Sequence, residues 1–189
     1  GAVADPLPQR TLAEAELRGD LGELVDREVA RAIEAKQMPG CVVTIGRQGA
    51  IVYQQAYGHR QLLPEPEEMT VDTLFDLASL TKPIATSTAV MQLVEQGRIR
   101  LADPASKYLP EFTSHGKEAI TVEQLLVHSS GLIPDNSLAD YREGQSAAYE
   151  KICALELRSP PGEEFRYSDV GFIVLGELVH RVTGQPLDE

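Results

Sequence analysis

The sequence predicts a mixed α/β (α+β) fold in which an N-terminal helix and a β-hairpin precede a mainly helical region. Apolar residues recur at helical spacing between 21 and 37. Two β-branched runs, 41–45 and 51–57, are joined through a short polar turn, which is typical of a hairpin. From residue 79 onward the chain carries helix caps and helical periodicity. The chain has 189 residues, of which 42% are hydrophobic, so a buried core is expected.

The N-terminal part of the chain is expected to hold one helix, the hairpin and a loop. Residues 1–11 contain two prolines and no periodicity, which predicts an extended lead-in to the segment 12–78. Asp20 stands where the N-cap of the helix is expected. Residues 58–70, with two prolines among acidic residues, predict a loop that leads into the helical region.

The segment 79–189 is expected to be mainly helical. A helix is predicted over 79–96, where Gly97 would end it. Thr121-Val122-Glu123-Gln124 has the pattern of a capping box, and another helix is expected at about 146–157. The last helix is predicted to end at Gly184.

A hairpin does not make a stable sheet by itself, because its apolar faces need further strands and helices to cover them. The sequence ends shortly after its last predicted helix. We therefore expect residues 1–189 to be the N-terminal part of a single domain whose C-terminal sheet strands are absent from this chain. Exposed sheet edges favour association, so a homodimer, or complementation by the missing C-terminal half, is also expected.

Composition narrows the classes of partner. The formal net charge is −12 and the pI is about 4.8, which argues against a nucleic-acid surface and against binding to an anionic membrane. No apolar run reaches the length of a membrane span, so no integral membrane segment is expected. Metal-ligand spacing and glycine-rich phosphate or dinucleotide patterns are missing, so neither a metal nor a cofactor is expected.

Ser79 and Lys82 lie three residues apart at the expected start of a helix. This spacing puts a hydroxyl and an amine on one face, where a neutral amine could take the hydroxyl proton and make Ser79 a nucleophile. Apolar neighbours of the serine are expected to desolvate the amine and lower its pKa. These neighbours are Leu74, Phe75, Leu77, Ala78 and Leu80. A bare Ser-x-x-Lys match is also common in solvated surface pairs, so the wider context matters.

Three motifs occur in order, namely Phe75–Lys82 (FDLASLTK), Leu125–Leu132 (LLVHSSGL) and Tyr167-Ser168-Asp169. In this combination the chain resembles the serine β-lactamase and DD-peptidase superfamily. It looks most like the class C β-lactamase-related branch, which also includes esterases and peptidoglycan hydrolases. The resemblance implies a β-lactamase/DD-peptidase-like fold, of which this chain would cover roughly the N-terminal half. The family's Lys-Thr-Gly or His-x-Gly element is not found after the third motif.

The resemblance implies catalytic roles for Ser79, Lys82 and Tyr167. Ser79 would be the acylated nucleophile and its N–H one oxyanion donor, Lys82 a proton acceptor or partner, and Tyr167 a proton shuttle with a pKa depressed by the lysine. Asp169 takes a substrate-binding position at which β-lactamases of this branch usually carry Asn. An ionised Asp only accepts hydrogen bonds and could instead pair with Lys82, which would hold the amine charged and weaken it as a base.

We therefore expect a serine hydrolase that acts through an acyl-enzyme on a small-molecule ester or amide, with peptidoglycan-derived compounds among the candidates. A β-lactamase or DD-peptidase is the alternative within the family, and a catalytically silent binding homologue is the alternative of another class. The resemblance favours the periplasm or cell envelope and leaves the cytoplasm open. His128 follows a predicted helix, where a histidine commonly complements the helix dipole and bonds a carbonyl, so a structural role is expected for it.

Overall fold

The computed structural model describes residues 6–189, so the first five residues of the expected lead-in lie outside the described residues. The chain forms two compact units, one ending at Asp76 and the other running from Leu77 to Glu189. This boundary lies next to the predicted division between 12–78 and 79–189. That the two units belong to one domain stays a prediction.

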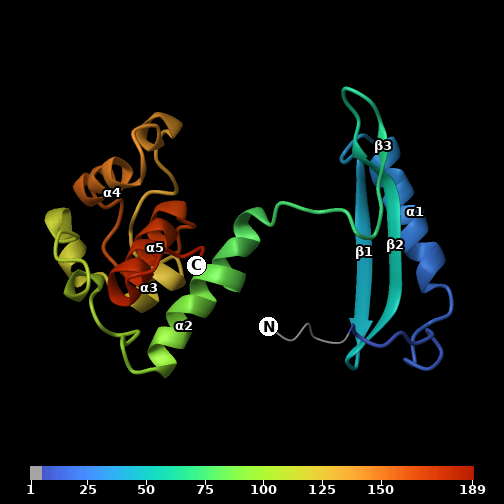
Figure 1. Cartoon of the computed structure of the whole chain (residues 1–189), viewed down its shortest axis with the longest axis horizontal. Coiled ribbons are helices and arrows are strands. Elements are labelled where there is room, and N and C mark those ends of the chain that lie inside the picture. The colour runs from blue at the N-terminus through green and yellow to red at the C-terminus, as the bar shows by residue number, and fades with distance from the viewer. Residues whose placement is uncertain (1–5) are drawn as a thin grey trace. The chain divides into compact units, whose positions relative to one another are not determined.

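The first unit combines one helix with a three-stranded antiparallel sheet in the order β1-β2-β3 (Figure 1). Its elements are α1 (Leu21–Glu34), β1 (Gly40–Arg47), β2 (Ala50–Gln61) and β3 (Glu67–Glu68). The hairpin is confirmed, and within the lead-in Gln9 forms a bridge with Ile51. The prediction that 58–70 is all loop was wrong, because Arg60 at the end of β2 forms an ion pair with Glu67 of β3 at 2.7 Å.

Helix α1 is tied to the sheet by a carboxylate that faces β2. Asp26 accepts hydrogen bonds from the hydroxyls of Tyr57, at 2.6 Å, and Tyr53, at 3.0 Å. Asp20 occupies the N-cap position as predicted, but its side chain does not cap the helix. Arg18 binds that carboxylate through two hydrogen bonds of 2.6 and 2.7 Å, so the carboxylate serves a local ion pair instead.

The second unit is helical. Its elements are η1 (Ala78–Leu80), η2 (Lys82–Ser87), α2 (Thr88–Glu95), η3 (Ala105–Lys107), η4 (Ser114–Ala119), α3 (Val122–Leu126), η5 (Leu138–Tyr141), α4 (Gln145–Ala154) and α5 (Asp169–Thr183). The apolar faces of α2, α3, α4 and α5 enclose one core together with residues of the segments between them. Its largest fully buried apolar side chains include Phe112, Ile120, Leu125, Leu132, Ile152, Leu175 and Leu178. Burial of this cluster fixes α3, α4 and α5 against one another.

The helix predicted over 79–96 is not one regular helix. It begins as the 3₁₀ turn η1, continues as the π-helix η2 and becomes α-helical only from Thr88. Pro83 lies at the start of η2, where it lacks the N–H of a regular turn and its ring would crowd the carbonyl four residues earlier. The widened turn avoids that crowding, and π-turns of this kind are frequent at functional sites.

The capping box and the glycine stop predicted for the second unit are confirmed. Thr121 and Gln124 form both hydrogen bonds of the capping box at the start of α3, at 3.0 and 3.2 Å. Helix α5 ends at Gly184, whose φ of +79° is the left-handed conformation that glycine adopts without strain. Among residues 6–189, none of the helices is both long and apolar enough to cross a bilayer.

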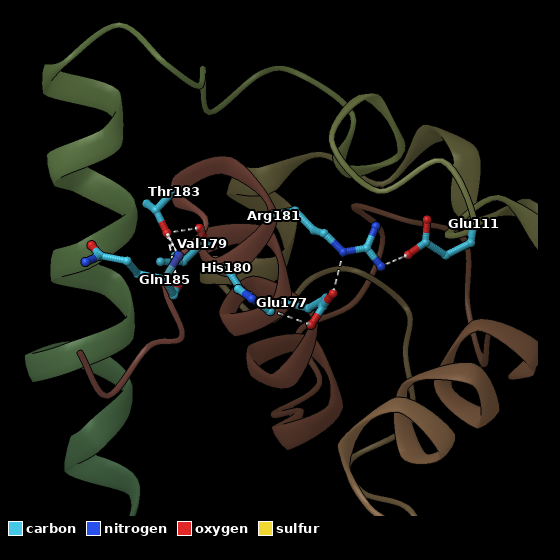
Figure 2. Close-up of polar contacts among 7 residues, drawn as sticks. All are labelled: Glu111, Glu177, Val179, His180, Arg181, Thr183 and Gln185. Atoms are coloured by element: carbon cyan, nitrogen blue, oxygen red, sulfur yellow. Dashed lines mark hydrogen bonds and ion pairs between the residues drawn. The ribbon is translucent and has the colours of Figure 1, made fainter.

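The C-terminal half of α5 is anchored by an ion-pair relay (Figure 2). Arg181 donates to Glu177 of the same helix and to Glu111 of the segment between η3 and η4, each at 2.7 Å. The relay joins neighbouring turns of α5 and ties them to the segment before η4. It therefore helps to fix the helix whose N-terminus carries Asp169.

Candidate active site

Ser79 and Lys82 lie together where the helical segment begins. The Lys82 amine donates a hydrogen bond to Ser79 Oγ, with 3.3 Å between Nζ and Oγ. Ser79 is exposed, whereas the Lys82 side chain is only 14% exposed. A substrate can therefore reach the hydroxyl, while the amine is largely shielded from water.

The spacing alone does not produce this contact. Ser114 and Lys117 repeat the Ser-x-x-Lys pattern. There, however, the serine hydroxyl donates to the carbonyl of Cys153 at 2.5 Å, and the buried amine donates to the carbonyl of Leu155. Ser79 thus differs from Ser114 in having the amine at its oxygen.

Two aromatic rings shield the Lys82 amine. Its Nζ lies 4.9 Å from the ring centroid of Tyr167 and 5.7 Å from that of Phe172, which allows cation–π attraction. The amine is desolvated as predicted, but the prediction that the apolar neighbours of Ser79 shield it was wrong. Leu77 and Leu80 are themselves 49% and 57% exposed, and the rings over the amine come from α5 and the segment before it.

Asp169, the first residue of α5, forms an ion pair with Lys82. Burial by itself lowers the pKa of Lys82, but hydrogen bonds to Asp169 and Tyr167, and their charges, outweigh it and raise that pKa. The predicted lowering of the pKa of Lys82 was therefore wrong, whereas the pairing with Asp169 that the sequence offered as an alternative is present. The amine is charged at neutral pH.

Tyr167 reaches both members of the Ser-Lys pair. Its side chain is 43% exposed. Hydrogen bonds with Lys82 and then with Ser79 lower the pKa of the Tyr167 hydroxyl, while the charge of Asp169 opposes this. The predicted direction of this shift is confirmed. The structure thus brings together all four residues expected at the site.

The start of α5 holds two of these residues in place. Ser168, between Tyr167 and Asp169, is 1% exposed and is the N-cap of the helix. Its Oγ accepts the N–H of Gly171 at 3.0 Å and donates to the carbonyl of Ile133 at 2.7 Å. The Asp169 carboxylate lies in the first turn, where the positive end of the helix dipole favours it.

His128 lies against the same loop. Its Nδ1 accepts the N–H of Ser168 at 3.0 Å, and its ring centroid lies 4.4 Å from that of Tyr167 and 5.0 Å from that of Phe172. The prediction that the side chain bonds a carbonyl at the end of α3 was wrong, because a φ of 59° turns the residue out of the helical path. Burial, and then the charge of Lys82, lower the pKa of His128.

Sequence reasoning missed Phe172 and the contacts of His128. The available signals were an aromatic residue three positions after Asp169 in the last helix, and the histidine inside the second motif. Neither signal identifies a neighbour, because the contacts join segments that are far apart in the chain.

A cavity of about 340 Å³ adjoins Lys82 and Asp169 and is also lined by Phe172, Ile173 and Gly176. A larger one, of about 620 Å³, lies beside α4 and the C-terminal half of α5 and contains none of the four predicted site residues. In the described part of the chain, no cluster of three or more His, Cys, Asp or Glu side chains is arranged to hold a metal ion.

Comparison with known proteins identifies the family of this chain. Residues 25–189 match the family model described as Beta-lactamase. The chain belongs to the Beta-lactamase family. The resemblance inferred from the three motifs is thereby confirmed, and so is the expected β-lactamase/DD-peptidase-like fold, with its mixture of helix and sheet.

Relatives in this family carry several hydrolase names. The chain is 34% identical to an N-acetylmuramyl-L-alanine amidase of Bacillus subtilis (strain 168), and the match covers 87% of the chain and 41% of that protein. Among solved structures, "EstCE1, a hydrolase with promiscuous acyltransferase activity" is similar with a TM-score of 0.78 at 27% identity, covering 93% of this chain and 49% of that one.

A D-alanine carboxypeptidase AmpC from Burkholderia cenocepacia is similar with a TM-score of 0.73 at 29% identity, covering 89% of this chain and 45% of that one. The chain thus spans less than half the length of each of these relatives. The relatives named here are all hydrolases: an amidase, a carboxypeptidase and a hydrolase with acyltransferase activity.

Proposed function

We propose that this chain supplies the nucleophile and the proton-transfer groups of a serine hydrolase that acts on an ester or amide through an acyl-enzyme. The observation that carries the proposal is the contact of a shielded, charged Lys82 with the exposed hydroxyl of Ser79, beside the Tyr167 hydroxyl. A solvated surface pair would have neither the two rings over the amine nor a tyrosine with a lowered pKa. A silent binding homologue would need no amine at the serine.

The charge of Lys82 supports Tyr167 as the proposed proton acceptor. Lys82 is held charged by Asp169, so it has no lone pair with which to take a proton. It donates to Ser79 Oγ, which leaves the hydroxyl proton to point toward Tyr167. A nearby ammonium stabilises the phenolate, so the tyrosine is a stronger candidate base than the lysine.

The proposed reaction has two halves. In acylation, Ser79 Oγ attacks the carbonyl carbon as its proton passes to the Tyr167 oxygen. Tyr167 then gives that proton to the leaving alkoxide or amine as the carbonyl–leaving-group bond breaks, and an ester on Ser79 remains. The backbone N–H of Ser79 is the proposed donor to the oxyanion of the intermediate.

In deacylation, water attacks the acyl carbon while Tyr167 takes one of its protons. The bond from the acyl carbon to Ser79 Oγ breaks, Tyr167 protonates that oxygen, and a carboxylic acid leaves. The same tyrosine therefore acts as base and acid in each half, as microscopic reversibility requires.

Peptidoglycan-derived amides and esters are the proposed substrates. Support comes from the names of the relatives, which include an amidase and a D-alanine carboxypeptidase. Asp169 makes β-lactams less suitable, because a carboxylate paired with Lys82 cannot donate a hydrogen bond to a substrate carbonyl. The cell envelope is the proposed location, because this is where such substrates occur.

The test is intact-mass spectrometry after incubation with a fluorophosphonate probe. It is made on residues 1–189 and on the full protein that the gene encodes. We expect one adduct on the full protein that disappears in Ser79→Ala and persists in Ser114→Ala, which alters the other Ser-x-x-Lys serine. An adduct that survives Ser79→Ala, or full protein that no acylating probe labels, would contradict the proposal.

A further inference from the structure

We propose that His128 is a positioning residue for catalysis, which holds Tyr167 in place only while its imidazole is neutral. The inference rests on the proposed function, because it concerns the tyrosine that moves the proton. The proposal gives His128 no contact with the reacting atoms. Its effect on Tyr167 comes from hydrogen bonds to the residues on either side of the tyrosine.

Both neighbours of Tyr167 are hydrogen-bonded to His128. The N–H of Arg166 donates to the His128 carbonyl at 2.7 Å, and the N–H of Ser168 donates to His128 Nδ1 at 3.0 Å. His128 therefore binds the residue before Tyr167 and the residue after it. Neither bond is part of a helix or strand, so both help to place this loop.

The imidazole also supports the tyrosine ring directly. The two rings are inclined by 30°, with centroids 4.4 Å apart, and the ring centroids of Phe172 and Phe165 lie 5.0 and 5.9 Å from that of the imidazole. Lateral movement of Tyr167 would break this contact. The ring pair thus helps to keep the hydroxyl near Lys82 and Ser79.

The Ser168 bond requires an unprotonated Nδ1, so the proton of the neutral ring lies on Nε2. The charged and titratable groups that face the imidazole are Lys82 from η2, Asp169 from α5 and the Tyr167 hydroxyl. The charge of Lys82 and burial disfavour protonation, while Asp169 opposes them. Protonation would remove the acceptor and place a second cation near Lys82, so we expect it to release the loop.

The backbone of His128 shapes the choice of variants. Its φ of 59° is left-handed, a conformation that Asn tolerates better than most residues. His128→Asn keeps an acceptor oxygen near the position of Nδ1 but cannot be protonated. His128→Phe keeps a ring but offers no acceptor. His115→Asn is the matched control, because His115 is exposed, has the same φ of 59° and takes part in none of the site contacts described above.

The experiment measures the rate at which the fluorophosphonate probe labels Ser79 of the full protein between pH 4 and pH 9. Below the pKa of Tyr167, protonation of the tyrosine alone gives a plot of the logarithm of the labelling rate against pH a slope of about one. At lower pH, where His128 is protonated as well, two protons inhibit the reaction, so this slope should steepen to about two. We expect His128→Asn to keep a slope of about one, and His128→Phe to label about tenfold or more slowly at pH 7. His115→Asn should match the unaltered protein.

A His128→Phe rate equal to that of the unaltered protein, or a slope that steepens equally in His128→Asn, would overturn the inference and leave the proposed function intact. Failure of every acylating probe to label the unaltered protein would overturn both. If the variants do not fold, nitrogen NMR of the unaltered protein decides. A neutral His128 with its proton on Nε2 at pH 7 supports the inference, and a charged ring or a proton on Nδ1 contradicts it.

Discussion

Asp169 forms an ion pair with Lys82, and this contact sets the charge of the amine. The carboxylate, at the first position of α5, raises the pKa of Lys82 through both its hydrogen bond and its charge. The same charge acts on Tyr167 in the upward direction, against the lowering by Lys82. One carboxylate therefore influences both titrations on which the proposed mechanism depends.

Replacing Asp169 with Asn is expected to move the whole pH profile of Ser79 labelling toward lower pH. The rate should rise as Tyr167 loses its proton and fall as Lys82 loses its proton. Removal of a negative charge lowers the pKa of both groups, so both limbs should move in the same direction. The measurement is the labelling rate as a function of pH.

Asp140→Asn is the control for this experiment. It removes another Asp–Lys pair, with Lys151 at 3.4 Å, that takes no part in the site. We expect its pH profile to coincide with that of the unaltered protein. A profile of Asp169→Asn that stays in place, or moves to higher pH, would show that the carboxylate does not control these two groups.

Replacing Tyr167 with Phe is expected to slow the labelling of Ser79 by about 10²- to 10⁴-fold, the usual contribution of a positioned acid or base. The change keeps the ring that lies over Lys82 and against His128, so the melting temperature should not fall. Tyr108→Phe, which removes a hydroxyl bound to Asp103 at 2.6 Å, is the matched control and should label normally. A labelling rate within tenfold of normal in Tyr167→Phe would exclude the tyrosine as the main base.

Much of the site could be predicted from the sequence because its residues lie in motifs with a characteristic order. Ser79, Lys82, Tyr167 and Asp169 were all expected at one site, and the structure brings them together. The end of α5 at Gly184 was predictable for a local reason, since a left-handed C-terminal residue favours glycine. The catalytic roles of Ser79, Lys82 and Tyr167 remain predictions.

The environment of the lysine could not be predicted, since it depends on tertiary packing. Local sequence around Ser79 indicated an amine desolvated by its apolar neighbours, but the shielding rings belong to Tyr167 and Phe172. The direction of the pKa shift of Lys82 then depends on whether Asp169 reaches it, which spacing along the chain does not determine. The π-turn of Lys82–Ser87 escaped prediction for a similar reason, because Pro83 indicates a helix start but not which turn replaces the regular one.

Replacing Ser168 with Ala is expected to lower the free energy of unfolding by about 1 to 2 kcal/mol. The change removes the N-cap of α5 and leaves the carbonyl of Ile133 without its hydrogen bond from Oγ. Chemical denaturation measures the loss. Ser137→Ala is the matched control, because Ser137 caps the short exposed turn η5 and should cost less. Equal losses in the two variants would show that burial of the cap does not increase its contribution to the free energy of unfolding.

Replacing Gly131 with Ala is expected to lower the free energy of unfolding by about 4 kcal/mol or more, or to prevent folding. Gly131 has a φ of +78°, and an added Cβ would overlap the backbone carbonyl oxygen of Ser159. Gly184→Ala separates the two causes, because that residue has a φ of +79° and open space around the added carbon. It should cost only the conformational part, about 1 to 2 kcal/mol. Gly131 lies in the same short segment as His128, so its displacement should also move His128. If Gly131→Ala is obtained in soluble form, we therefore expect the probe to label its Ser79 more slowly. Similar losses in the two variants would contradict the close approach of residues 131 and 159.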